Sequence, residues 1–241
     1  MMIGHQMLRC LTFVALLGVL LAFTPTDDRI AKRVVDPTQE AITLHWKDRS
    51  GNILGNIGAL ERELSASGRQ LLFAMNGGMY TADHGPVGLY IEGGRILHRI
   101  DRRIEGKGNF HMQPNGVFGI LEDGTAFVKT TAAMQDMLHV RYATQSGPML
   151  IANGIINTNF TPGSKNLHIR NGVGVRADGQ VVFAISREPI NFHDFSTWFQ
   201  EQGCANALYL DGSVSKAYIP EVGVAGMDGD LGVLIAVTAP R

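Results

Sequence analysis

The sequence has little cysteine, little net charge and no apolar run long enough to cross a membrane. Only two of its 241 residues are cysteines; Cys10 lies in the N-terminal segment, which leaves a single thiol, Cys204, in the rest of the chain. One thiol cannot form an intramolecular disulfide, so a disulfide framework is excluded. The formal net charge of −1 gives no electrostatic basis for binding nucleic acid. The run from Leu11 to Phe23 is shorter than the roughly 20 residues of a membrane span.

The sequence also lacks the short motifs of several enzyme classes. Its eight histidines are scattered, with no His-x-x-x-His or Cys-x-x-Cys grouping, so the spacing does not support a zinc site. It has no Gly-x-Ser-x-Gly elbow and no phosphate-binding P-loop. We therefore expect no metal and no cofactor. A metal-dependent phosphodiesterase is disfavoured because it would need clustered carboxylates and histidines.

The N-terminus has the pattern of a secretory signal. Arg9 precedes the apolar run, and a basic region before a short apolar segment is typical of a signal peptide. No good small-x-small cleavage pattern occurs near Ala22, so an uncleaved membrane anchor is the alternative. We assign residues 1–24 to a signal peptide or anchor, 25–40 to a linker and 41–241 to one domain. The expected location is periplasmic or secreted.

Glycine is abundant, and its placement predicts the fold class. The chain has 29 glycines, against roughly 17 expected from average usage. Many lie in Asp-Gly, Asn-Gly or Gly-Gly turns between short β-branched runs, which is typical of hairpins. Apolar spacing predicts a few helices, at residues 57–64, 132–138 and 195–202. The prediction is an α+β domain with a mixed, mostly antiparallel sheet, hairpins and a few helices.

Three apolar runs end in small polar residues. They lead into Asn76-Gly77-Gly78, into Gln145-Ser146 and into Asp211-Gly212, and we expect these turns to converge on one pocket. The first turn could form a nest of backbone N–H groups for an anion or a sugar oxygen, or a plain turn that needs positive φ. Asp211 could be a catalytic or ligand-binding carboxylate, or a turn residue that caps its own backbone.

Arg170 is an arginine within an apolar, glycine-bearing strand region. Burying a guanidinium is costly unless the group is paired. It could face Asp211 as a structural partner, or bind an anionic ligand through its planar fork, and the sequence leaves both interpretations open.

Several motifs occur together in a fixed order. They are Asn76-Gly77-Gly78-Met79-Tyr80, the segment 109–118, Gln145-Ser146-Gly147-Pro148-Met149-Leu150, the segment 170–175 and Leu210-Asp211-Gly212-Ser213-Val214-Ser215. The ordered set resembles the phosphodiester glycosidase domain family over roughly residues 70–237. Two positions depart from the family pattern. Ser213 stands where the family often has a second glycine, and Met79-Tyr80 stand in place of an aromatic pair.

The resemblance implies an exported hydrolase that cleaves a sugar-1-phosphodiester at the anomeric carbon, in envelope or extracellular glycans. The partner is then a glycan or glycosyl-phosphate substrate. The residues implied as catalytic are Asp211 and Arg170, and those implied as substrate-binding are Asn76, Gly77, Gly78, Asn115, Gln145, Ser146, Gly212 and Ser215. The alternative is a non-catalytic envelope glycan-binding domain on the same fold, because fold does not fix function.

Overall fold

Strands dominate the structure, a computed structural model that describes residues 28–211 and 214–241. The helices are α1 (Ile57–Ala66) and α2 (Phe192–Glu201). The strands are β1 (Ile30–Val35), β2 (Ala41–His45), β3 (Arg69–Asn76), β4 (Tyr90–Glu92), β5 (Arg95–His98), β6 (Gly116–Leu121), β7 (Ala126–Thr130), β8 (Val140–Ser146), β9 (Met149–Ala152), β10 (Ile155–Ile156), β11 (Asn171–Arg176), β12 (Val181–Ser186), β13 (Cys204–Tyr209), β14 (Ala217–Ile219), β15 (Val224–Ala225) and β16 (Leu234–Pro240).

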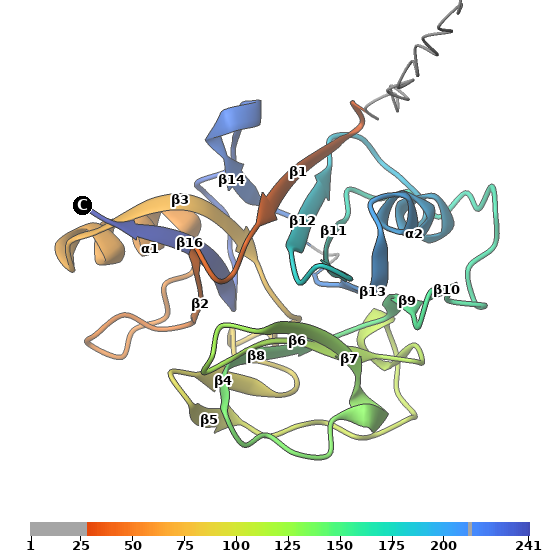
Figure 1. Cartoon of the computed structure of the whole chain (residues 1–241), viewed down its shortest axis with the longest axis horizontal. Helices are drawn as coiled ribbons and strands as arrows, with labels where there is room; N and C mark the ends of the chain where they lie inside the picture. The colour runs from red at the N-terminus through yellow and green to blue at the C-terminus, as the bar shows by residue number, and fades with distance from the viewer. Residues whose placement is uncertain (1–27, 212–213) are drawn as a thin grey trace, which may run out of the picture.

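The strands form three sheets that surround a common centre (Figure 1). Sheet I has the order β1-β12-β11-β13-β9-β10, sheet II the order β15-β14-β3-β16-β2, and sheet III the order β5-β4-β8-β6-β7. The strand pairs within them are antiparallel. The predicted α+β class and its antiparallel pairing are confirmed, although the strands are divided among three sheets where the sequence indicated one.

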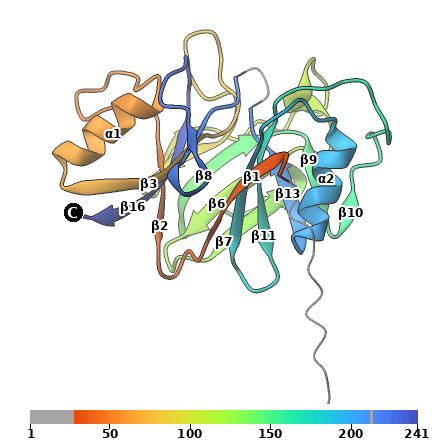
Figure 2. The same ribbon diagram turned by 90° about the horizontal axis from the view of Figure 1, so that it is seen from above.

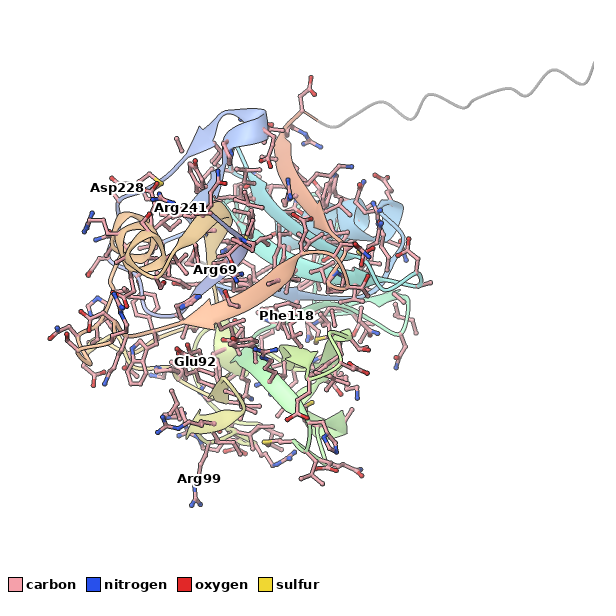
Figure 3. All side chains as sticks on the ribbon, turned by 60° about the vertical axis from the view of Figure 1, so that its left-hand side comes forward. Arg69, Glu92, Arg99, Phe118, Asp228 and Arg241 are labelled. Atoms are coloured by element: carbon pink, nitrogen blue, oxygen red, sulfur yellow. The ribbon has the colours of Figure 1, made fainter. Side chains whose placement is uncertain are left out.

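Three phenylalanine rings, one from each sheet, meet in the core. Phe183 of sheet I stacks on Phe73 of sheet II with ring centroids 4.9 Å apart, and it meets Phe118 of sheet III edge-on at 5.7 Å. All three side chains are fully buried, and Phe118 is labelled in the interior in Figure 3. Offset and edge-on pairs are favoured geometries for aromatic rings. This contact fixes the three sheets relative to one another.

Each helix covers one sheet, and the two lie at opposite ends of the molecule (Figure 2). Helix α1 packs on β3 of sheet II and ends before Gly68, whose φ of +72° suits glycine. Helix α2 packs on β9 and β13 of sheet I. It begins earlier than the apolar spacing predicts, because the Asn191 side chain accepts a hydrogen bond from the backbone N–H of Asp194 at 2.8 Å and caps the helix at that point.

Two predictions about local structure are wrong. The stretch 25–40, expected to be a linker, contains β1, which pairs with β12 along its whole length and buries Val35. The helix expected over 132–138 is reduced to a single 3-10 turn at Thr131–Ala133. The four hairpins expected at 88–97, 115–129, 149–156 and 171–186 are confirmed as β4–β5, β6–β7, β9–β10 and β11–β12.

The place of β1 in sheet I can be tested by substitution. Val35→Asp would bury an unpaired carboxylate in the core, so we expect the free energy of unfolding in urea to fall by about 3 kcal/mol or more. The matched control is Gln39→Asp, at an exposed position outside the strand, which should change stability by less than about 0.5 kcal/mol. Equal stabilities for the two variants would show that this segment is a linker and does not form part of sheet I.

Candidate active site

The three polar turns predicted from the sequence come together where the sheets meet. Strand β3 of sheet II ends at Asn76, β8 of sheet III ends at Ser146, and β13 of sheet I leads into Asp211. Ser146 Oγ donates to the carbonyl oxygen of Leu210, which ties the end of β8 to the chain just before Asp211. The expected convergence of the turns is therefore found, with each sheet contributing one strand end.

A buried asparagine that the sequence analysis gave no role joins these ends. Asn171, the first residue of β11, is fully buried. Its Nδ2 donates to the backbone oxygen and to Oδ1 of Asn76, both at 3.0 Å. Its Oδ1 accepts from the backbone N–H of Asp211 at 3.1 Å and lies 3.5 Å from Ser215 Oγ. A buried carboxamide is stable only when such partners satisfy it, and here its partners position Asp211.

Asn76 and Ser215 also hold the Asp211 segment, and we call the hydrogen-bonded side chains of Asn171, Asn76 and Ser215 the frame. Nδ2 of Asn76 donates to the Val214 carbonyl at 2.8 Å, and its Oδ1 accepts from the Lys216 N–H at 2.8 Å, so one side chain binds the backbone on both sides of Ser215. Ser215 Oγ donates to the carbonyl oxygen of Asp211 at 2.9 Å. Both residues were predicted to bind substrate, and the structure gives them the role of holding the segment that carries Asp211.

The predicted N–H nest at Gly77 and Gly78 is not formed. The Gly77 N–H donates to the Val233 carbonyl at 2.8 Å, and the Gly78 N–H donates to Thr144 Oγ1 at 3.1 Å. Neither glycine has positive φ, so the simple-turn interpretation also fails. A Cβ at Gly78 would clash with the carbonyl oxygen of Gln145. Glycine is required here because two backbones approach closely, and the N–H groups are not available to an anion.

Gln145 and Asn115, both implied to bind substrate, form hydrogen bonds to the protein itself. Gln145 Oε1 accepts from the backbone N–H groups of Leu89 and Asp101, each at 2.9 Å. Its Nε2 donates to the Asp101 carbonyl at 2.6 Å and to Thr131 Oγ1 at 3.1 Å. Asn115 Nδ2 donates to the carbonyl oxygen of Phe110, 3.0 Å away. These two side chains fix loops against sheet III, while Gly212, also predicted to bind substrate, lies outside the described residues.

Arg170 is buried without a carboxylate partner in the described part of the chain. Its Nε donates to the Ile190 carbonyl at 2.8 Å, and Nη2 donates to the Asn166 carbonyl at 3.0 Å. The guanidinium stacks on Phe192, with its central carbon 3.6 Å from the ring centroid. The direct pair with Asp211 is thus not formed. Burial lowers the pKa of Arg170, and the neighbouring Tyr209 opposes that shift.

Two phenols that the sequence analysis did not single out lie near Asp211. Burial raises the pKa of Tyr209 to about 12; the Arg170 charge opposes this rise and the Asp211 charge adds to it. Burial likewise raises the pKa of Tyr80 to about 12, with smaller contributions from Asp211 and Asp230. Tyr209 precedes Asp211 by two residues, the spacing that directs strand side chains to one face. Both phenols are therefore neutral near pH 7 and close enough to Asp211 for its charge to raise their pKa.

Comparison with known proteins identifies the family. Residues 69–231 match the family model for phosphodiester glycosidase. The chain belongs to the phosphodiester glycosidase family. YigE of Escherichia coli K12, described as uncharacterized, is 36% identical over 186 residues, which cover 77% of this chain and 72% of YigE.

Solved structures share the fold of this phosphodiester glycosidase family member. The catalytic domain of zebrafish N-acetylglucosamine-1-phosphodiester alpha-N-acetylglucosaminidase, auto-inhibited by its pro-peptide, is similar with a TM-score of 0.60 and 15% identity, over 90% of this chain and 84% of that one. A Burkholderia pseudomallei protein described as exported has a TM-score of 0.58 and 12% identity, over 86% and 73% of the two chains. At these identities, the likeness shows the fold.

Residues 28–211 and 214–241 contain no group of three or more histidine, cysteine, aspartate or glutamate side chains placed to hold a metal ion. None of their helices is long and apolar enough to cross a membrane.

Removal of the Asn171 carboxamide tests the frame. Asn171→Ala leaves the buried amide of Asn76 and the N–H of Asp211 without their partner, and we expect the free energy of unfolding to fall by about 3 kcal/mol. The control is Asn159→Ala, which removes a single exposed hydrogen bond to the Gln113 carbonyl and should cost no more than about 1 kcal/mol. Urea unfolding of both variants measures the difference, and similar losses would refute the central role of Asn171.

Proposed function

We propose that this protein is an exported hydrolase that cleaves the bond between the anomeric carbon of a sugar and a phosphodiester, in envelope or extracellular glycans. One observation carries the proposal: in a chain of the phosphodiester glycosidase family, the Asp211 segment is held at the junction of three sheets by buried hydrogen bonds from Asn171 and Ser215. Rigid support of a single carboxylate is what a catalytic constellation needs.

The chemistry suits a site with one carboxylate. The departing phosphate monoester is a weakly basic anion, so it needs less help from a general acid than the alcohol leaving group of an ordinary glycoside does. The remaining demand is a negative charge beside the anomeric carbon, where positive charge develops in an oxocarbenium-like transition state. Asp211 is our candidate for that group, either as nucleophile or as electrostatic stabiliser.

Arg170 acts on Asp211 through Tyr209 in this proposal. A guanidinium has only donors, so Arg170 can point an N–H at the Tyr209 oxygen but cannot accept its proton. The Tyr209 hydroxyl is fully buried and has no hydrogen-bond partner of good geometry among the described residues. Its O–H is therefore free to donate towards the Asp211 carboxylate. The chain Arg170–Tyr209–Asp211 would hold the carboxylate ionised and oriented.

The second candidate function is a non-catalytic envelope glycan-binding domain on the same fold. Ser213 favours it, because a serine stands where the family often has the second glycine of its final motif. The two functions differ in one observable: an enzyme releases free sugar from a glycosyl phosphodiester, whereas a binding domain retains the substrate intact.

The proposed location is the periplasm or the exterior, reached through a signal peptide within residues 1–24. The basic residue and the short apolar run at the N-terminus support it, as does the likeness to a protein described as exported. An uncleaved anchor is the alternative.

Turnover can be tested with an N-acetylglucosamine-1-phosphodiester, such as UDP-N-acetylglucosamine, within a panel of nucleoside-diphosphate sugars. We expect Asp211→Asn to reduce release of free sugar by about a thousandfold or more, because the amide cannot stabilise positive charge. Its thermal midpoint should stay within about 2 °C of the parent. The control is Asp178→Asn, at an exposed hairpin turn, which should keep full activity. A large loss of stability with retained activity in Asp211→Asn would contradict its catalytic role.

The path from Arg170 through Tyr209 predicts a change in pH dependence. Tyr209→Phe removes the hydroxyl that we propose donates to the carboxylate, so the ionised form of Asp211 should be stabilised less and the acidic limb of the kcat/KM profile should move to higher pH by about half a unit to one unit. The substitution leaves unchanged Tyr80, whose pKa the Asp211 charge also raises, and the Asp230 and His84 groups behind it.

Arg170→Lys separates the two interpretations of Arg170. Lysine keeps the charge but loses the fork and the stack on Phe192. If Arg170 acts through Tyr209, the variant should shift the acidic limb as Tyr209→Phe does, and the double variant should add little more. A rise in KM with an unchanged profile would instead show that Arg170 binds the phosphate directly.

A further inference from the structure

A cavity of about 400 Å³ lies between sheets II and III, away from Asp211. Thr43 and His45 of β2, Arg69 of β3, and Arg141 and Tyr142 of β8 contribute to its lining. Arg69 begins the strand that Asn76 ends, so the Arg69 end of the cavity lies roughly 20 Å from Asn76. Figure 3 labels Arg69 close to β2 on this side of the molecule. The volume falls within the range of small-molecule sites.

Two guanidinium groups give this cavity a positive character. Nη2 of Arg69 donates to the backbone oxygen of Thr238 at 3.4 Å and to its hydroxyl, whereas Nε and Nη1 make no hydrogen bond within the described part of the chain. Arg141 is exposed, and its side chain forms no ion pair there. The carboxylate of the lining, Glu122, instead contacts His139 Nδ1 at 3.2 Å. Two arginines with free donors are suited to a phosphate or a carboxylate.

The other polar groups of the cavity are neutral. His45 Nε2 lies 2.9 Å from Thr43 Oγ1. Burial lowers the pKa of His45 to about 4, against a small opposing effect of the Glu63 charge, so the imidazole is uncharged near neutral pH. A neutral imidazole and a hydroxyl exchange hydrogen bonds with sugar hydroxyls without adding charge. The Tyr142 ring beside them offers an apolar face, with the Arg141 guanidinium carbon 5.7 Å from its centroid.

We infer that this cavity binds a sugar that carries a phosphate or carboxylate group. The arginines would hold the anionic group, while Thr43, His45 and Tyr142 would contact the ring and its hydroxyls. This site is separate from the one proposed for catalysis and does not require that the protein be an enzyme. In an envelope glycan with repeated anionic units, it would hold one unit while another reaches Asp211.

The test is calorimetric titration of the purified full chain at pH 7 with glucose 6-phosphate, galacturonic acid, glucose and inorganic phosphate. We expect the phosphorylated sugar, the uronic acid or both to bind at least about tenfold more tightly than glucose and than inorganic phosphate. Which of the two binds more tightly identifies the anionic group. Arg141→Gln and Arg69→Gln should each weaken that binding about tenfold.

Two controls make the outcome decisive. Arg95→Gln, on the exposed strand β5, should leave binding unchanged, and so should Asp211→Asn because Asp211 does not line the cavity. Arg141 is exposed, so its variant should fold even if Arg69→Gln does not. Three results would each overturn the inference. The first is inorganic phosphate binding as tightly as the anionic sugars. The others are binding that survives Arg141→Gln but is lost in Asp211→Asn, and no binding at all. None of these results depends on turnover.

Discussion

A single buried carboxamide, that of Asn171, connects the parts of this molecule on which the candidate site depends. It donates to Asn76 at the end of β3 and accepts from the backbone of Asp211, so it links sheet II to the segment that follows β13 of sheet I. Aspartate would lack the donors, and an apolar residue would lack both donors and acceptors. In a dry interior such a network is favourable only when each member is satisfied. This requirement makes the arrangement of the strand ends specific.

The same hydrogen-bond network shows which polar residues support the site. Most of the polar side chains expected to contact substrate, including Asn76, Gln145 and Ser146, direct their hydrogen bonds to the protein itself. They hold the Asp211 segment in a defined place, and in our proposal the chemistry falls to that carboxylate with Tyr209 beside it. Arg170, which is held by backbone carbonyls and stacked on Phe192, is a fixed charge behind Tyr209.

The sequence predicts the elements that are specified by adjacent residues and misses the strand pairs that join distant parts of the chain. Turn dipeptides beside alternating strands predicted the four hairpins correctly, because a hairpin is specified by adjacent residues. The division into three sheets depends on pairs such as β2 with β16, which are far apart in the sequence and leave no local signal. For the same reason β1 was mistaken for a linker, since only its pairing with β12 makes it a strand.

In the candidate site, convergence of the turns could be predicted, whereas their internal contacts could not. The sequence offers Gly78 as part of an N–H nest or of a plain turn, but glycine is needed there because the Gln145 backbone passes close to it. Tyr209 has the pattern of an ordinary core residue in an apolar strand, and only the fold brings Arg170 close to it. Asn171 lies within a motif of the family, but its role as the shared partner of Asn76 and Asp211 depends on tertiary structure.

The central claim is that the bond broken is the one between the anomeric carbon and oxygen. Turnover of an N-acetylglucosamine-1-phosphodiester in heavy-oxygen (18O) water, with mass spectrometry of the released phosphate monoester, tests it most directly. Attack of water or Asp211 at carbon leaves the bridging oxygen on the phosphate, so we predict a phosphate product free of heavy oxygen. Heavy oxygen in that phosphate would show attack at phosphorus and contradict the account.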